Sequence, residues 1–177
     1  MNLYFRVLGV LLRFWTGTRR ADPLGPSALS LRVWPNDLDP NRHLNNGRYL
    51  TLMDLGRFDL TLHSGLMREI IRRRWMPVLG DATITFQRPL KLFQRFTLTT
   101  TIVGWDEKWL YMEQTFERNG KRAATAMVKG LLRGADRNVP TAEVLAAVGV
   151  TVASPPLPAA FVAWARVADD LRASDRD

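Results

Sequence analysis

A long apolar segment followed by four strand-like segments constrains the fold of this 177-residue chain more than any other feature. Between Gly47 and His63 the apolar residues surround most of the helical circumference, which is typical of a helix buried on all sides. They are Tyr49, Leu50, Leu52, Met53, Leu55, Phe58, Leu60 and Leu62. Four segments that read as strands follow without intervening helices, at 82–90, 95–105, 108–118 and 121–133. We therefore expect an α+β fold in which an antiparallel sheet wraps around one long helix.

Short local signals support this arrangement. Asn119-Gly120 separates the last two strand-like segments and is the strongest short hairpin signal. Residues 28–34 alternate between apolar and polar side chains, which predicts a strand ahead of the central helix. Gly56 weakens helix propensity inside that helix, so we expect another part of the chain to approach closely there. Pro77 is expected to end the helical region.

The first 20 residues form a separate N-terminal part, predicted as an amphipathic helix. The apolar run at 1–15 is interrupted at Asn2, Arg6, Gly9 and Arg13, which recur at helical spacing and form one narrow stripe. The run is too short and too interrupted by arginine to span a bilayer. Two positions remain open for this helix: packing on protein, or peripheral contact with a membrane through residues 1–15.

The rest of the chain divides into a sheet domain at 21–135 and a C-terminal helical extension at 136–177. A short helix is expected after Pro140, capped by Thr141 and closed by Gly149. A last helix is predicted with Phe161, Trp164, Ala168 and Leu171 at the spacing of core positions.

Composition excludes several kinds of chemistry. The chain has no cysteine and only two histidines, which excludes disulfides, thiolate chemistry and a His-rich metal centre. We expect no metal and no cofactor, and a cytoplasmic location, with the inner face of the membrane as a peripheral alternative. The net charge of +8 suits anionic partners, but no nucleic-acid-reading pattern accompanies it, so nucleic acid is not expected as a partner.

The segment DLDPNRHLNNGRYL at 37–50 carries the candidate chemistry. It places Asp39 just before the N-terminus of the central helix, where free N–H groups favour negative charge. Asn45 or Asn46 can cap that helix. A carboxylate beside such N–H groups is the minimum set for acyl transfer, because it can take a proton or attack a carbonyl while the N–H groups stabilise the oxyanion. The alternative is that Asp37 and Asp39 only form turns.

The stretch DLDPNRHLNNGRYLTLMDLGR resembles the signature of hotdog-fold thioesterases. Its Asp-Leu-Asp-Pro start and the ten-residue spacing to Tyr49 resemble the 4-hydroxybenzoyl-CoA thioesterase group. Its D-x-N-x-H-L-N-N core resembles the hotdog domain of plant acyl-ACP thioesterases. The later VGWDEKWLYMEQTF is similar to thioesterase superfamily member six and its bacterial relatives. The resemblance covers roughly residues 28–135 and implies a hotdog fold, in agreement with the strand order above.

The resemblance implies a role for each residue of the motif. It makes Asp39 the catalytic carboxylate, with Asn41 and His43 at the positions where the plant enzymes use an Asn and a His. It implies that the Asn46 backbone N–H is the oxyanion donor and that Tyr49 lines the site.

Two positions depart from the pattern of the family. Arg42 stands where the 4-hydroxybenzoyl group keeps glycine, and Phe93-Gln94 replaces the usual Gly-Asp between two strands. These departures bear on the backbone conformation near the site and on the substrate.

The expected function is hydrolysis of a fatty or aromatic acyl-CoA by a homodimer or tetramer with sites at the subunit interface. An acyl-ACP is the alternative substrate, and a non-catalytic acyl-binding protein at a membrane is the alternative function. Hydratase patterns do not occur, because Leu-Asn-Asn follows His43. Three consecutive arginines could bind the CoA phosphates, although a solvated helix end is the favoured interpretation; they are Arg72, Arg73 and Arg74.

Overall fold

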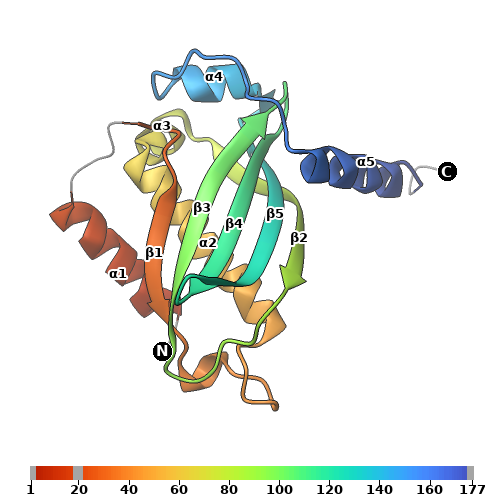
Figure 1. The fold of residues 1–177 in the computed structure, drawn as a ribbon. Coiled ribbons are helices and arrows are strands. Elements are labelled where there is room, and N and C mark those ends of the chain that lie inside the picture. The colour runs from red at the N-terminus through yellow and green to blue at the C-terminus, as the bar shows by residue number, and fades with distance from the viewer. Residues whose placement is uncertain (1–2, 18–21, 175–177) are drawn as a thin grey trace.

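The central helix lies against the concave face of a curled antiparallel sheet (Figure 1). The computed structural model describes residues 3–17 and 22–174. The helices are α1 (Leu3–Thr16), α2 (Asn46–His63), α3 (Leu66–Arg73), α4 (Thr141–Ala146) and α5 (Ala159–Ser174), with a 3-10 turn at Pro35–Asp37. The strands are β1 (Ser27–Arg32), β2 (Met76–Phe86), β3 (Arg95–Trp105), β4 (Leu110–Arg118), β5 (Lys121–Arg133) and β6 (Asn138–Val139). The sheet order is β1-β3-β4-β5-β2 with β6 on β5, and every pairing is antiparallel, so the predicted α+β architecture is confirmed.

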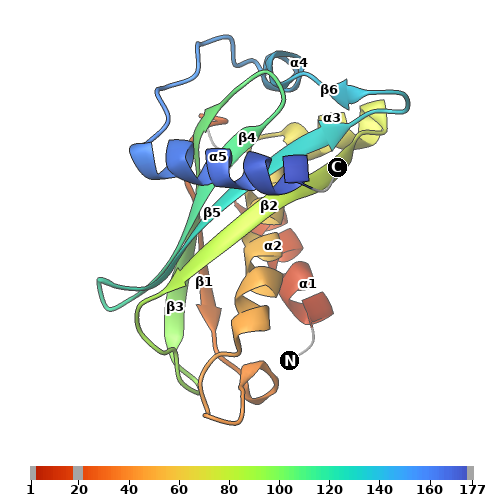
Figure 2. The ribbon, with the colours of Figure 1, turned by 90° about the vertical axis from the view of Figure 1, so that its right-hand side faces the viewer.

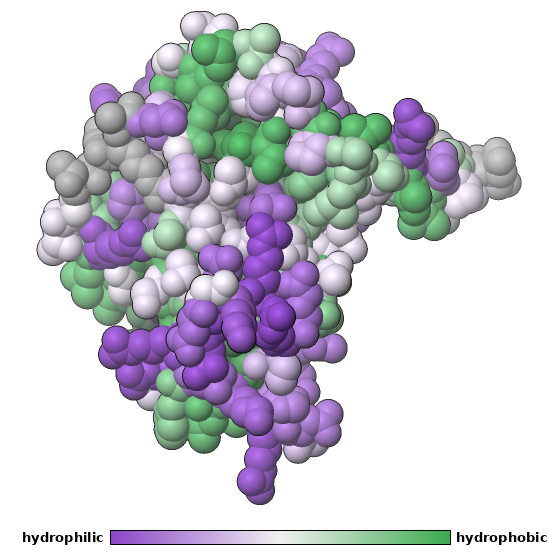
Figure 3. Space-filling view, viewed as in Figure 1, coloured by the Kyte–Doolittle hydropathy of each residue, from purple (hydrophilic) through white to green (hydrophobic). Residues whose placement is uncertain are grey.

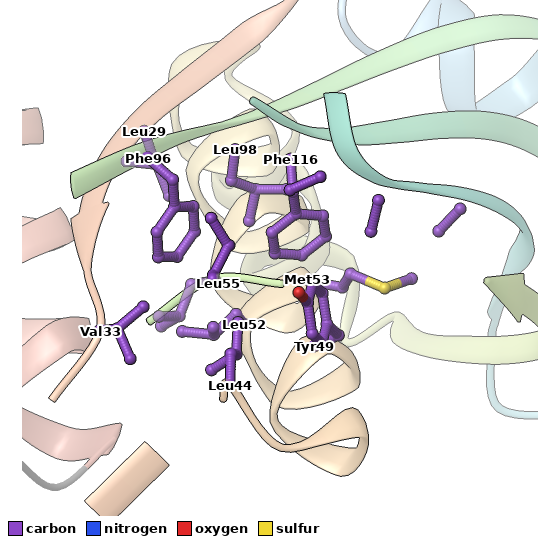
Figure 4. Close-up of a cluster of buried hydrophobic side chains, with 14 of the residues drawn as sticks. Leu29, Val33, Leu44, Tyr49, Leu52, Met53, Leu55, Phe96, Leu98 and Phe116 are labelled. Carbon is purple, nitrogen blue, oxygen red and sulfur yellow. The ribbon is translucent and has the colours of Figure 1, made fainter. Parts of the chain in front are cut away.

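Helix α2 is held to the sheet by apolar packing and by one buried amide. Its apolar side chains meet those of β1, β3 and β4 in the core shown in Figure 4. The Nε2 group of Gln114 on β4 donates to the Met53 carbonyl oxygen at 3.0 Å and to Thr100 Oγ1 at 2.8 Å. A Cβ atom on Gly56 would lie 2.5 Å from Thr100 Oγ1, so the predicted close approach is confirmed.

The β4–β5 hairpin is also confirmed. Arg118 pairs with Lys121, and the two residues between them have positive φ, 52° at Asn119 and 70° at Gly120. Both central residues of a type I′ turn need this conformation.

The predicted end of the helical region at Pro77 is late, because α3 ends at Arg73 and β2, which contains Pro77, begins at Met76. Strand β2 pairs only with β5, and proline is tolerated on such an edge strand because only one side must supply hydrogen bonds. The strand is therefore longer at its start than the segment at 82–90 that the sequence predicts.

Helix α1 turns its arginines toward the protein. Arg6 is buried, and its guanidinium donates to the Asp37 carboxylate and to the Arg32 carbonyl oxygen. Arg13 donates to the Ala28 carbonyl oxygen at 2.7 Å. Leu3, Val7, Leu11 and Phe14 pack against the core around buried Val10. The predicted packing on protein therefore describes one face of α1; Asn2, the first member of the predicted polar stripe, lies outside the described residues.

The C-terminal helices cover one end and the outer face of the sheet. Helix α5 crosses the face opposite α2, as Figure 2 shows. Thr141 is the first residue of α4 and Pro140 is its N-cap, so the predicted cap at Thr141 is wrong; the Thr141 hydroxyl donates instead to the Asp106 carbonyl oxygen. Gly149 has a φ of 80°, as expected of a residue that closes a helix.

The core-facing side of α5 is only partly as predicted. Phe161 and Ala168 are buried, whereas Leu171 is 67% exposed and does not belong to the core. The buried ammonium of Lys129 holds the middle of the helix. It donates to Asp169 Oδ1 at 3.0 Å and lies 5.8 Å from the centre of the Trp164 ring.

Candidate active site

A short loop closed on itself positions Asp39. The Asp39 N–H donates to the His43 carbonyl oxygen at 2.9 Å, and the His43 N–H donates to Asp39 Oδ1 at 3.0 Å. The Arg42 N–H completes the loop by donating to the Asp39 carbonyl oxygen at 3.0 Å. Asp39 is half-buried, and no hydrogen bond to its second carboxylate oxygen, Oδ2, occurs within the described part of the chain. That oxygen can therefore meet a water molecule or a substrate.

Asp37, two residues earlier, has a different environment. It is 2% exposed, and its carboxylate accepts from Arg6 and, at 2.9 Å, from the Trp34 N–H. Its carbonyl oxygen accepts from the Asn45 N–H at 2.8 Å. Asp37 is thus a buried structural anion, which leaves Asp39 as the acid of this pair that solvent can reach.

The N-terminus of α2 follows the loop directly. Asn45 is the N-cap, and its Oδ1 accepts from the Gly47 N–H at 2.9 Å. Asn46 is the first helical residue and is exposed, and the N–H of a first helical residue has no acceptor within the helix. Asn41 is exposed and His43 is half-buried on the same loop. The structure therefore brings Asp39, Asn41, His43 and Asn46 to one end of α2.

Both departures from the family pattern adopt glycine-like backbone conformations. Arg42 and Phe93 each have a φ of 60°. This is the left-handed region, which costs a residue with a side chain about 1–2 kcal/mol. The loops thus keep a backbone shape that suits glycine. The guanidinium of Arg42 is exposed beside the Asp39 loop.

Tyr49 lies one turn into α2 with its ring in the core. The residue is 3% exposed and makes edge contacts with Phe86 and Phe116 at centroid distances of 5.0 and 4.8 Å (Figure 4). Burial raises the pKa of its phenol to about 12, so the hydroxyl stays protonated at neutral pH. Its contact with Phe86 links the beginning of α2 to the end of the edge strand β2.

An apolar cavity of about 230 Å³ lies farther along α2, and no sequence motif predicted it. Its wall combines α2, α3 and the beginning of β2, and includes Leu60, Ile70, Val78, Leu79, Met112 and Leu131. Arg57 also lines it and donates to Gln114 Oε1 at 2.8 Å. Burial lowers the pKa of Arg57, and Asp54 opposes that shift.

The three consecutive arginines lie at the other end of α2. Arg72 and Arg73 end α3, where both bind Glu69, and Arg74 follows them. The 18 residues of α2 separate this end from Asp39 by about 27 Å at 1.5 Å per residue. One copy of the chain therefore does not bring the arginines to Asp39. Within 3–17 and 22–174 there is also no group of three acidic or histidine side chains that could hold a metal.

Comparison with known proteins gives a consistent set of relatives. The family described as "Thioesterase-like superfamily" matches residues 33–165. "Protein THEM6" of Danio rerio is 33% identical over 139 residues, which cover 77% of this chain and 69% of that protein. "Thioesterase lcsJ" of Purpureocillium lilacinum is 28% identical over 110 residues, or 51% of this chain, and only 36% of its own length is covered. The match to "Protein THEM6" of Xenopus laevis spans 41% of that protein.

Solved structures share the fold. The probable thioesterase YbaW of Escherichia coli superposes with a TM-score of 0.63 at 21% identity, over 68% of this chain and 94% of that one. The structure named BH1999 gentisyl-coenzyme A thioesterase gives a TM-score of 0.62 at 20% identity, over 68% and 99%. The wrapped sheet around one helix that the sequence predicts is the architecture of these proteins, and the expected hotdog fold is confirmed.

Proposed function

Because this chain belongs to the thioesterase-like superfamily, we propose that it hydrolyses acyl thioesters with Asp39 as the catalytic carboxylate. The observation that carries the proposal is the contrast between the two acids of the loop. Asp37 is buried and occupied by Arg6, whereas Asp39 is half-buried with one oxygen bound to its own loop. Asp39 also directly precedes the N-terminus of α2, where an oxyanion is favoured.

In the proposed reaction the thioester carbonyl oxygen accepts from the Asn46 N–H. Either Asp39 removes a proton from water as the water attacks the carbonyl carbon, or Asp39 attacks that carbon and water releases the acyl group. In both routes the C–S bond breaks, the thiol leaves with a proton, and the acid is released. Asn41 and His43 are the proposed side chains that orient water or substrate beside Asp39.

A CoA or acyl-carrier thioester is the proposed substrate class. Exposed cations lie at the end of the molecule that carries Asp39. Lys91 forms an isolated backbone β-bridge with His43, and the Arg88 guanidinium donates to the Arg122 carbonyl oxygen at 2.7 Å. Figure 3 shows hydrophilic residues gathered over this lower end of the molecule. Phosphates of CoA or of a phosphopantetheine arm complement this charge. The names of the solved relatives include a coenzyme A thioesterase and a protein in complex with CoA, which agrees with this class.

A homodimer through the edge strand β2 is part of the proposal. Strand β2 has a partner on one side only, and its exposed Met76, Leu79 and Phe86 are apolar. Two copies of β2 paired antiparallel would place the beginning of one strand beside the end of the other. Arg72–Arg74 of a second copy, just before its β2, would then approach the Asp39 end of the first copy. A tetramer of such dimers is the larger alternative.

The substitution Asp39→Asn tests the catalytic assignment. It keeps the size of the side chain and removes its charge, so kcat should fall by at least about a hundredfold, the low end for a positioned general base. Release of free thiol from acyl-CoAs of graded chain length measures the rate. Thermal unfolding of the same samples separates loss of chemistry from loss of fold.

Two further variants test the roles of Asn41 and His43. Asn41→Ala and His43→Ala should reduce kcat less than Asp39→Asn does, because each only orients a reacting group. An Asp39→Asn protein that folds normally and keeps nearly full turnover would refute the assignment. If the unmodified protein binds acyl-CoA without turnover, the alternative of a non-catalytic acyl-binding protein holds.

A further inference from the structure

The outward face of α1 is apolar along its whole length. Five large side chains form this face, which we call the outer ridge, with exposures of 78, 65, 51, 57 and 82% for Tyr4, Phe5, Leu8, Leu12 and Trp15. At 100° per residue they fall within one arc of about 100° that contains no charged residue. Arg6 and Arg13 lie on the opposite side of the helix, where both donate to backbone carbonyl oxygens of β1. Within α1, no charged side chain lies among the five residues of the outer ridge.

A basic helix lies beside α1, next to the inward-packed Phe14. Phe14 of α1 shares an open apolar groove with Met67, Arg68, Ile71 and Arg72 of α3. Residues 66–74 contain four arginines against one acid, Glu69, which gives a local charge of +3. Helix α1 lies beside α2, and its Arg6 and Arg13 reach the backbone of β1, while α3 follows the end of α2 (Figure 2). Ile71, which is 71% exposed, adds to the apolar surface between the two helices.

We propose that the outer ridge and the arginines of α3 together bind the surface of an anionic lipid bilayer. Leu8, Leu12 and Phe5 would enter the boundary between headgroups and acyl chains. Tyr4 and Trp15, near the two ends of the ridge, have the amphipathic rings that favour this boundary. The α3 arginines would meet lipid phosphates. The 14 residues of α1 are about 21 Å long, and the helix lies along the membrane plane.

Charge favours a lipid surface over a second copy of the chain. A symmetric pairing through the outer ridge would bring the same surface of each copy together, including two α3 regions with a charge of +3 each. Like charges placed opposite each other oppose such a contact. An anionic bilayer instead offers the opposite charge over the whole area. This inference does not rest on the proposed hydrolysis.

Co-sedimentation with vesicles tests the proposal on the full chain. Wild-type protein should sediment with phosphatidylcholine vesicles that contain 30% phosphatidylglycerol and should bind pure phosphatidylcholine at least about tenfold more weakly, because the arginine term needs anionic lipid. The double substitution Leu8→Gln and Leu12→Gln should reduce partitioning at least about tenfold, because both side chains then stay in water. Arg68→Gln should reduce binding to the anionic vesicles only.

The chain offers a matched control on another helix. Val167 and Leu171 on α5 are also exposed, at 58 and 67%, so Val167→Gln with Leu171→Gln replaces two exposed apolar side chains without changing α1. That variant should bind vesicles as wild type does. If the Gln variant unfolds in a thermal melt, Leu8→Met with Leu12→Met serves in its place. This variant keeps apolar side chains and should keep binding. The proposal would be overturned if wild type did not sediment with anionic vesicles, or if the Leu8/Leu12 Gln variant folded and still bound fully. It would also be overturned if the particle mass of the Leu8/Leu12 variant fell in light scattering, because the ridge would then be an interface between copies.

Discussion

At the scale of single residues, an aspartate's environment separates two acids that look equivalent in the sequence. Asp37 and Asp39 share one short motif, and either can form a turn. What distinguishes them is Arg6, which lies 31 positions away on α1 and is buried against Asp37. No local pattern could reveal that pairing, because it depends on where α1 docks.

This pairing predicts a large effect of Asp37→Asn on stability. The substitution leaves the Arg6 guanidinium buried without its counter-charge, which should cost about 3 kcal/mol of unfolding free energy. Urea unfolding measures it. Asp54→Asn is the control, because Asp54 is 66% exposed in its ion pair with Arg57 and should cost no more than about 1 kcal/mol. Equal costs for the two substitutions would contradict a structural role for Asp37, and the folded Asp37→Asn protein should keep most of its kcat.

The glycine-like residues show which part of the motif the sequence could predict. The resemblance identified Arg42 and Phe93 as departures, and both turn out to have a φ of 60°. The position of the strain was thus available from the sequence. The sequence could not show whether the backbone there keeps the glycine-like conformation, because a non-glycine residue could equally occur in a relaxed loop with another backbone path.

At the scale of elements, the segments with local signals were predicted well. β3 and β5 begin and end at the predicted residues, and the Asn119-Gly120 turn joins β4 to β5 as expected. β2 was predicted too short because Pro77 normally breaks structure, and only its place at the sheet edge makes it tolerable. The amphipathic pattern of α1 was visible, but the inward direction of its arginines depends on the buried acids of other elements.

Helix α5 should depend on one ion pair. Asp169→Asn removes the carboxylate partner of buried Lys129 and should speed hydrogen exchange of α5 amides at least about tenfold, because the ammonium is then buried without that counter-charge. Asp170→Asn changes the next, exposed residue and should leave exchange unchanged. No difference between the two variants would show that α5 does not depend on this ion pair.

The same pair gives α5 a dependence on pH. The hydrogen bond from Lys129 lowers the pKa of Asp169 from its ordinary 3.8. A lowered pKa in the folded state contributes stability that is fully present above the ordinary value and is lost as pH falls through the lowered value. Exchange of α5, corrected for the intrinsic effect of pH, should therefore accelerate only in acid below pH 4, and the Asp169→Asn variant should lack that acceleration.

At the scale of the whole molecule, one copy of the chain holds the candidate site in two separated parts. Asp39 and the oxyanion end of α2 lie at one end, and the cavity and Arg72–Arg74 lie toward the other. The sequence grouped Asp39, Asn41, His43 and Asn46 into one candidate site because they lie within eight consecutive positions. The separation follows from α2, whose 18 residues lie between the two parts.

Mixed dimers test whether two copies combine these parts. Replacing Arg72, Arg73 and Arg74 with Gln should raise KM and leave kcat nearly intact, the signature of lost uniform binding. If the arginines serve the partner's Asp39, co-refolding this variant with Asp39→Asn should restore one unmodified site in each mixed dimer, about a quarter of all sites in an equal mixture. Thiol release at low acyl-CoA concentration measures this. Light scattering that shows a monomer, or a mixture no more active than its parts, would contradict a shared site.

The sheet order also has a consequence for the route by which the chain folds. Strands β3, β4 and β5 are consecutive neighbours, and the β4–β5 turn closes between Arg118 and Lys121. In contrast, the partner of β1 lies far along the chain, since Ser27 pairs with Thr100 of β3. Contacts between distant residues carry a larger loop-closure entropy and form more slowly. We expect the β3–β5 meander to assemble first and the two outer strands to join last, so that the nascent chain exposes α1 and α2 until most of the protein has been synthesised.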